Sequence, residues 1–149
     1  MKSTSLQVFF ALAAKMTLQI HPLNVTAAFL NGTLREMVFM RQPKGFEELG
    51  KEAWVWKLKC ALYGLKQGGC EWYACIDKFL MQNLGFAHTF ADHLLYVYKS
   101  GSSVIIVPLY VDDLLIGYED ENHMLQIKDA LEQWFKMVDA GPASGVLGM

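Results

Sequence analysis

Two adjacent acidic residues interrupt a stretch of chain that is otherwise built for burial. The apolar run Val104–Tyr110 leads into Val111-Asp112-Asp113, and a second apolar run, Leu114–Tyr118, follows. Both runs have the length and residue types of strands, so the acids fall in the bend between them. Adjacent carboxylates repel each other and lose hydration there, which a folded chain tolerates best when a cation neutralises them. A divalent ion that also holds substrate phosphates is one interpretation, and a solvated acidic turn is the other.

The pattern around this bend predicts strands interleaved with helices. We predict helices over about Ser5–Leu18, Trp72–Leu84 and Met124–Phe135, and strands at Gln19–Val25, Met37–Gln42, Trp54–Leu58, Leu94–Lys99, Val104–Tyr110 and Leu114–Tyr118. No linker or repeat divides the chain before a loose end at Asp139–Met149. The expected fold class is therefore α+β, in a single domain with one antiparallel sheet and helices packed on one face.

Local signals support several of these boundaries. Gly85 stands where a glycine ends a helix in the left-handed conformation, and Ser100-Gly101-Ser102 forms the turn of a hairpin. Asp120, Glu121 and Asn122 favour the start of the third helix. The apolar stretch Leu6–Ala14 fits either a secretory signal or a buried helix whose N-cap oxygens come from Ser3, Thr4 or Ser5.

Charge and cysteine content narrow the classes of function. The net charge of −2 is unevenly distributed, with +5 over residues 1–70 and −7 over residues 71–149, which would let one end face phosphate and the other metal. The three cysteines Cys60, Cys70 and Cys75 show neither disulfide nor zinc spacing. They favour an intracellular, reducing location, cytoplasmic or nuclear. No apolar run reaches the roughly 18–20 residues of a membrane span, so no membrane partner is expected.

Several short motifs, in order, resemble the reverse transcriptases of copia-type retrotransposons. They are Ala27-Ala28-Phe29-Leu30-Asn31-Gly32, Gln42-Pro43-Lys44-Gly45-Phe46, Leu62-Tyr63-Gly64-Leu65-Lys66-Gln67, Trp72-Tyr73, Leu84-Gly85-Phe86, Ala91-Asp92-His93 and Tyr110-Val111-Asp112-Asp113. The likeness runs from about Ser5 to Leu147-Gly148, and its specificity lies in the combination of LYGLKQ with YVDD.

This resemblance implies a polymerase-palm-like fold and an RNA-directed DNA polymerase that extends a primer 3′ end with two Mg²⁺ ions. It implies a partial domain over 1–149, with a palm core at about 5–138 and the fingers, thumb and RNase H regions absent. Primer–template nucleic acid and dNTP are the implied partners, with missing polymerase regions or another protein supplied in trans. The implied metal ligands are Asp112 and Asp113, and the implied nucleotide- or primer-side residues are Phe29, Gln67 and Tyr110.

The sequence departs from the family pattern at the first catalytic aspartate, which falls on Asn24. An amide keeps the shape of the side chain but removes a charge from a ligand that touches both ions in the family. Pro22 and Pro108 fall inside predicted strands, where each removes a ladder N–H. Gly68-Gly69-Cys70 replaces the expected small residue, proline and arginine. Together with the absence of the fingers and thumb that the resemblance implies, these departures predict negligible polymerase activity from this chain on its own.

Three other interpretations are compatible with the sequence. One is a domesticated protein-interaction module, and another is a relic reading frame without a selected function. A third alternative is a weak nucleic-acid binder that uses Arg35, Arg41, Lys44, Lys57, Lys59 and Lys66. The four histidines, His21, His88, His93 and His123, show no ligand spacing and are interpreted as ordinary core or surface residues.

Overall fold

The computed structural model describes residues 1–101, 103–139 and 141. The chain divides into two compact units, the first formed by Met1–Ala28 with Ile76–Met149 and the second by Phe29–Cys75. The prediction of one domain over the whole chain stays a prediction. Ser102 of the predicted turn and the end of the resemblance at Leu147-Gly148 lie outside the described residues.

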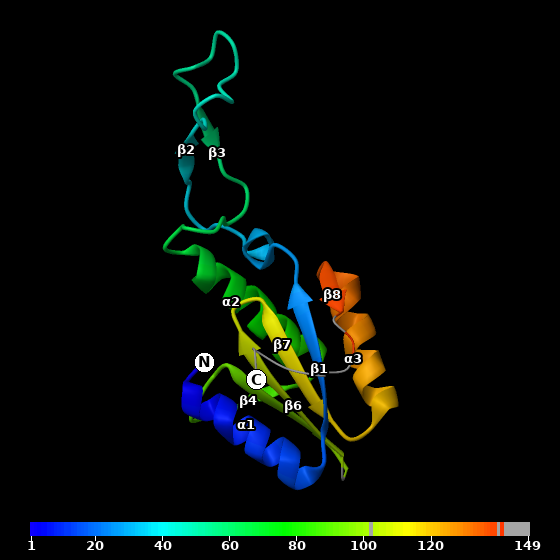
Figure 1. Cartoon of the computed structure of the whole chain (residues 1–149). Helices are drawn as coiled ribbons and strands as arrows, with labels where there is room; N and C mark the ends of the chain where they lie inside the picture. The colour runs from blue at the N-terminus through cyan, green and yellow to red at the C-terminus, as the bar shows by residue number, and fades with distance from the viewer. Residues whose placement is uncertain (102, 140, 142–149) are drawn as a thin grey trace. The chain divides into compact units, whose positions relative to one another are not determined.

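A six-stranded antiparallel sheet forms the centre of the first unit (Figure 1). Its spatial order is β4 (Ala87–His88), β5 (Leu95–Ser100), β6 (Ser103–Tyr110), β7 (Asp113–Tyr118), β1 (Gln19–Val25) and β8 (Met137–Asp139). The predicted strands of this unit and the hairpin of β5 with β6 are confirmed. The α+β class is confirmed, and the likeness to a polymerase palm stays a prediction.

Helices cover both faces of this sheet, so the expectation of helices on one face is wrong. On one face, α1 (Ser3–Met16) lies so close that a Cβ atom on Gly117 of β7 would meet the Phe9 ring at 2.8 Å. On the opposite face, Tyr96 of β5 donates to Asp77 of α2 (Gly68–Lys78) at 2.8 Å. Also on that face, α3 (Glu121–Trp134) brings His123 edge-on to Tyr98. The reason lies in β6, where Ile105–Leu109 are all buried, because a strand buried on both faces needs cover on both.

The helix boundaries differ in detail from the predictions. α1 begins at Ser3 with Lys2 as its N-cap and no side-chain cap, so the expected serine or threonine cap is wrong. Ser5 instead donates its hydroxyl to Asp92 at 2.7 Å. The second helix ends as α2 at Lys78 and continues as a π-helical turn, η2 (Phe79–Asn83). Gly85 follows with φ +73°, so its predicted left-handed conformation is confirmed.

Pro22 leaves the ladder between β1 and β7 intact. Val25 donates its N–H to Asp112 on the β7 side, and Thr26 donates to Lys136 on the β8 side. Because successive N–H groups of a strand point to opposite sides, the nitrogen of Pro22 faces the β8 side. Among the described residues, β8 pairs with Leu23–Val25, and Pro22 lies outside this pairing.

Pro108 does interrupt a ladder. Leu109 donates its N–H to Leu94 on the β5 side, so the nitrogen of Pro108 faces β7. The β6–β7 pairing skips positions 107 and 108 and resumes in the same register at Leu109. The pairing of Leu95 with Pro108 keeps β6 in the middle of the sheet despite this gap.

The second unit contains a two-stranded antiparallel sheet of β2 (Phe39–Arg41) and β3 (Val55–Lys57). These strands confirm the two predicted ones in shorter form. The short 3₁₀ helix η1 (Ala28–Asn31) starts at the last residue of the first unit's N-terminal segment. No described helix is both long and apolar enough to cross a membrane.

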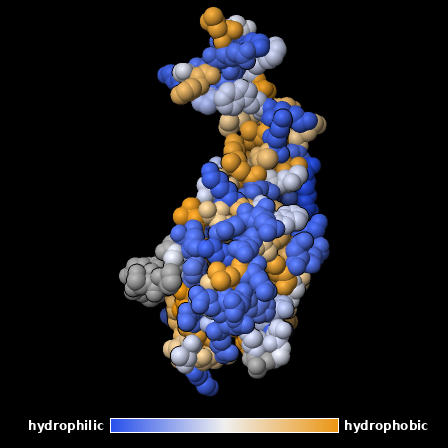
Figure 2. All heavy atoms as spheres, turned by 90° about the vertical axis from the view of Figure 1, so that its right-hand side faces the viewer, coloured by the Kyte–Doolittle hydropathy of each residue, from blue (hydrophilic) through white to orange (hydrophobic). Residues whose placement is uncertain are grey.

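The surface beside β8 and α3 is mostly polar. Figure 2 views the molecule from the side on which these two elements lie in Figure 1, and hydrophilic residues cover most of it, with small hydrophobic areas between them. This agrees with α3, which buries Met124, Ile127 and Leu131 against the sheet and turns its charged residues outward.

Candidate active site

The acidic bend is a tight hairpin turn between β6 and β7. Tyr110 pairs with Asp113, so Val111 and Asp112 are its two turn residues. Val111 has φ +58°, a left-handed conformation for which hairpins of this kind prefer glycine. A β-branched residue held there stores strain of about 1–3 kcal/mol. Such strain is typical of functional turns, where the surrounding structure fixes an unfavourable conformation.

Asn24 lies directly opposite this turn. The register of β1 with β7 pairs Asn24 with Asp113, and the Asn24 Nδ2 atom donates to Asp113 Oδ1 at 2.8 Å. The next residue, Val25, donates its backbone N–H to the carbonyl of Asp112 at 2.8 Å. The fold therefore brings together Asn24, Asp112 and Asp113, the three positions to which the resemblance assigns catalysis, and their catalytic roles stay predictions.

The polarity of the Asn24 contact follows from chemistry. An ionised carboxylate only accepts hydrogen bonds, so Asn24 must present its NH₂ group, and not its carbonyl oxygen, to Asp113. An aspartate at position 24 would instead place a second carboxylate against Asp113, and the two charges would need a cation between them. The amide stabilises Asp113 without one.

This donor set has one carboxylate fewer than the family pattern implies, because Asn24 stands at the position of the first aspartate. Mg²⁺ binds oxygen ligands, whereas Asn24 turns a nitrogen donor towards Asp113. The carboxylates of the turn come from Asp112 and Asp113 alone. Across residues 1–101, 103–139 and 141, no three His, Cys, Asp or Glu side chains gather closely enough to hold a metal ion.

Tyr110 lies on the same face of the sheet as Asn24 and Asp113. Paired residues of neighbouring strands point to one face, and Tyr110, Asp113 and Asn24 form such a row across β6, β7 and β1. Tyr110 is 51% exposed and lines a hollow of about 420 Å³ with Met1, Lys2, Ser3 and Leu6. This placement is compatible with a position beside a primer end, which stays a prediction.

Phe29 and Gln67 belong to the second unit. The Phe29 ring stacks on Tyr63 with 4.0 Å between ring centroids. Gln67 lines an open pocket of about 370 Å³ together with Arg35, Glu36, Lys66 and Glu71. Arg35 also pairs with Glu71 at 3.2 Å. The predicted roles of Phe29 and Gln67 beside a nucleotide stay predictions.

The sequence reasoning missed a second polar cluster on β1. His21 is only 6% exposed, and its Nε2 atom lies 2.6 Å from Asp139 Oδ1. Asp139 is the last residue of β8, so the prediction that the loose end begins at Asp139 is wrong. The Lys128 ammonium beside it lowers the pKa of Asp139 well below its usual value, with smaller contributions from the Gly141 N–H and His21. The sequence did indicate such a cluster, because His21 shares one face of the strand with the apolar residues Leu23 and Val25, and a buried polar side chain needs a partner.

Comparisons with known proteins identify the family of this chain. The family model described as reverse transcriptase (RNA-dependent DNA polymerase) matches residues 1–149. The chain is 42% identical over 149 residues to the retrovirus-related Pol polyprotein from transposon TNT 1-94 of Nicotiana tabacum, covering 99% of this chain and 11% of that protein. It is 38% identical over 138 residues to the Pol polyprotein from transposon RE1 of Arabidopsis thaliana, covering 93% and 9%.

A shorter relative is the putative transposon Ty5-1 protein of Saccharomyces cerevisiae, 32% identical over 127 residues, which cover 85% of this chain and 41% of that protein. The chain thus spans about a tenth of the first two relatives and under half of the third. The match over all 149 residues shows that the chain belongs to the reverse transcriptase family, as a region of the type found in copia-type retrotransposon Pol polyproteins.

Proposed function

We propose that this domain handles primer–template nucleic acid and dNTP as a segment of a longer Pol-type polypeptide, and that Asn24 leaves it with negligible polymerase activity of its own. Reverse transcriptases act on nucleic-acid templates and use a divalent metal. An intracellular location, cytoplasmic or nuclear, belongs to the same proposal. The observation that carries the proposal is the hydrogen bond from Asn24 Nδ2 to Asp113 Oδ1.

The physical reason is that Asn24 lacks the negative charge with which an aspartate at this position would help to hold a cation beside the reacting groups. In nucleotidyl transfer, the attacking 3′ oxygen has to lose its proton and the leaving pyrophosphate gains negative charge, and cationic stabilisation of both is worth several kcal/mol. A site that donates an amide to its own carboxylate holds cations less well. Since each ~1.4 kcal/mol is a factor of ten in rate, we expect a deficit of at least ~100-fold.

Primer extension tests this proposal. The purified chain and its Asn24→Asp variant are compared on an RNA template with a DNA primer, dNTPs and Mg²⁺, after circular dichroism has shown that both are folded. We expect extension by the variant at least ~100-fold faster than by the original chain.

Two controls separate the role of position 24 from a general effect. Asp113→Asn in the Asn24→Asp background keeps the carboxylate count of the original chain and should abolish the gain. Glu132→Gln in the same background changes an exposed charge on α3 and should leave the gain intact. Comparable rates for the original chain and Asn24→Asp, whether both are active or both inert, would mean that Asn24 alone does not set the activity of this chain.

A second candidate function, weak nucleic-acid binding, is favoured by one face of the second unit. Phe39 pairs with Lys57, and Arg41 pairs with Val55, so these four residues share a face of the β2–β3 sheet. All four are exposed. A row of cations beside an aromatic ring is typical of surfaces that bind single-stranded nucleic acid through phosphate contacts and base stacking. Such binding would not need Asp112 or Asp113.

A further inference from the structure

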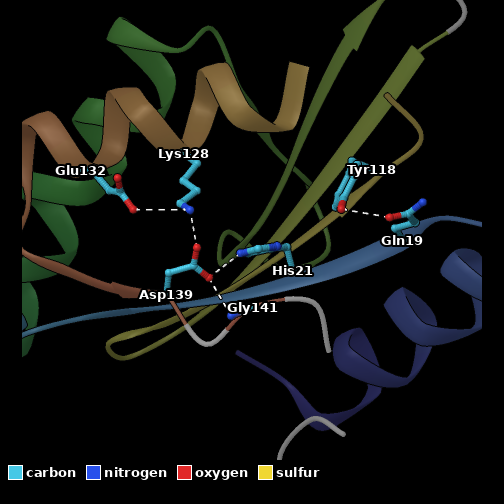
Figure 3. Close-up of polar contacts among 7 residues, drawn as sticks. All are labelled: Gln19, His21, Tyr118, Lys128, Glu132, Asp139 and Gly141. Carbon is cyan, nitrogen blue, oxygen red and sulfur yellow. Dashed lines mark hydrogen bonds and ion pairs between the residues drawn. The ribbon is translucent and has the colours of Figure 1, made fainter. Parts of the chain in front are cut away.

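A cluster of charged and polar side chains joins three elements of the first unit at the β8 edge of the sheet (Figure 3). His21 comes from β1, Asp139 from β8 and Lys128 from α3, and their side chains converge on the Asp139 carboxylate. The backbone N–H of Gly141 donates to the same carboxylate at 2.7 Å. The carboxylate is therefore the common acceptor of the cluster.

The two oxygens of Asp139 share the donors between them. Oδ1 accepts from His21 Nε2 and from the Gly141 N–H, while Oδ2 accepts from the Lys128 ammonium. Lys128 has a second, longer contact of 3.8 Å with Glu132. Hydrogen bonds to an ionised acceptor are about twice as strong as neutral ones, so the Asp139 bonds are the strong ones in this cluster.

This contact selects one tautomer of the neutral His21 ring. Its side chain is 7% exposed, and its Nδ1 atom is buried without a hydrogen-bond partner among the described residues. A neutral imidazole carries one N–H, and only Nε2 has an acceptor, so the proton belongs on Nε2. His21 then donates to Asp139, and the bond fixes the ring against β8.

β8 depends on such a contact because it is short. Among the described residues, Leu23, Asn24 and Val25 of β1 pair with it, and edge strands of this length gain little from their ladder alone. The middle pair of this ladder is Asn24 with Val138, while on its other side Asn24 pairs with Asp113. β8 thus supports the strand segment that faces the acidic turn.

We propose that Asp139 is a positioning residue, which joins His21 of β1 to Lys128 of α3 and so holds β8 in register behind Asn24, opposite Asp113. The site that it positions is the one of the proposed function, on which the purpose of this role rests. Asp139 does not touch the acidic turn. It acts through β8 and β1, which carry the position of residue 24.

Amide hydrogen exchange, followed by NMR on the ¹⁵N-labelled full chain, tests this role. The reporters are the Thr26 N–H, which donates to Lys136, and the Val25 N–H, which donates to Asp112. The reference is the Leu109 N–H, which donates to Leu94 on the far side of the turn. In Asp139→Asn we expect protection of the two reporters to fall about tenfold relative to the reference, the loss typical of a charge-assisted bond.

Matched variants separate positioning from general stability. His21→Leu should reproduce the loss, and His21→Gln, whose amide can still donate to Asp139, should keep most of the protection. Glu132→Gln and Tyr118→Phe should leave the ratio unchanged, because the first alters only the longer Lys128 contact and the second removes the separate Tyr118–Gln19 bond in Figure 3.

Two results would overturn the proposal. One is a parallel fall at the reporters and the reference, which would mark Asp139 as a general stabilising residue. The other is unchanged protection of Val25 and Thr26. If Asp139→Asn does not fold, the comparison of His21→Leu with His21→Gln decides in the same way. The experiment needs no polymerase activity, so its outcome is independent of primer extension.

Discussion

At the scale of single residues, the important feature of the site is which atom of the Asn24 side chain faces Asp113. Asn24 has a nitrogen where an aspartate has a second carboxylate oxygen. This nitrogen donates a hydrogen bond to Asp113, whereas a carboxylate at position 24 would repel Asp113. Val111 adds a strained backbone at the tip of the same turn. Both features concern the packing of the turn against β1, and both have consequences that can be measured without substrate.

Replacing Asn24 with aspartate should make the stability of the domain depend on divalent cations. Without Mg²⁺ the new carboxylate loses the hydrogen bond to Asp113 and repels it, which should lower the unfolding free energy by about 1–3 kcal/mol. Added Mg²⁺ should restore part of this loss by binding only the folded state. Thermal unfolding followed by circular dichroism, with EDTA or with Mg²⁺, measures both effects.

The original chain is the control for this comparison. Its Tm should respond to Mg²⁺ much less than that of Asn24→Asp. An equal rise in Tm for both proteins would show that the amide does not hinder cation binding at the turn.

At the scale of elements, most strands and helices were predictable because their apolar residues follow simple periods. The hairpin of β5 with β6 and the helix α3 are examples. We did not predict that helices cover both faces of the sheet, although the unbroken run of apolar residues in β6 indicates a strand buried on both faces. β8 and the 3₁₀ turn at Ala28 were missed because elements of three or four residues carry no period. The proximity of Asn24 to Asp112 and Asp113 was predictable from the resemblance. The contact of His21 with Asp139 was not, because it joins residues 118 apart in sequence.

The attachment of α1 gives a prediction at this scale. Asp92 accepts hydrogen bonds from the Lys2 N–H, the Ser5 hydroxyl and the Leu94 N–H, and so joins the start of α1 to the turn before β5. Burial alone would raise the pKa of Asp92, but these donors more than offset it and the pKa is lowered. Asp92→Ala should therefore lower the unfolding free energy at pH 7 by about 1–3 kcal/mol, measured by urea unfolding.

The effect of this substitution should depend on pH in a defined direction. Because the folded-state pKa of Asp92 lies below its ordinary value, the carboxylate contributes its full stability above about pH 4 and loses it as the pH falls through the folded-state pKa. The gap between the original chain and Asp92→Ala should narrow below pH 4. Glu48→Gln, which breaks only an exposed ion pair, should change little at any pH. A gap that stays constant down to pH 2 would contradict this account of Asp92.

At the scale of the whole molecule, charge is divided between the two units. Residues 29–75 hold seven Lys or Arg and five Asp or Glu, whereas the rest of the chain holds six and ten. The excess of positive charge thus lies in the unit that carries the exposed face of Phe39, Arg41, Val55 and Lys57. Negative charge lies in the unit with the acidic turn, where phosphate would be repelled without a cation.

If the second unit binds nucleic acid, its affinity for a single-stranded oligonucleotide should fall with salt. Two or three phosphate contacts would give a slope of log K against log salt of about −1.5 to −2, measured by fluorescence anisotropy. Arg41→Gln with Lys57→Gln should flatten this slope, and Asp112→Asn with Asp113→Asn should not. A flat salt response of the original chain would remove nucleic-acid binding as a function of this face.

The most direct test of the central claim is primer extension by the original chain beside Asn24→Asp, with both proteins shown to be folded. The hydrogen bond from Asn24 to Asp113 predicts that a single exchange of amide for carboxylate restores Mg²⁺-dependent extension, by at least ~100-fold, and that Asp113→Asn removes it again. Extension by the original chain at the rate of the variant, or no extension by either, would contradict the claim that Asn24 alone accounts for the low polymerase activity of this chain.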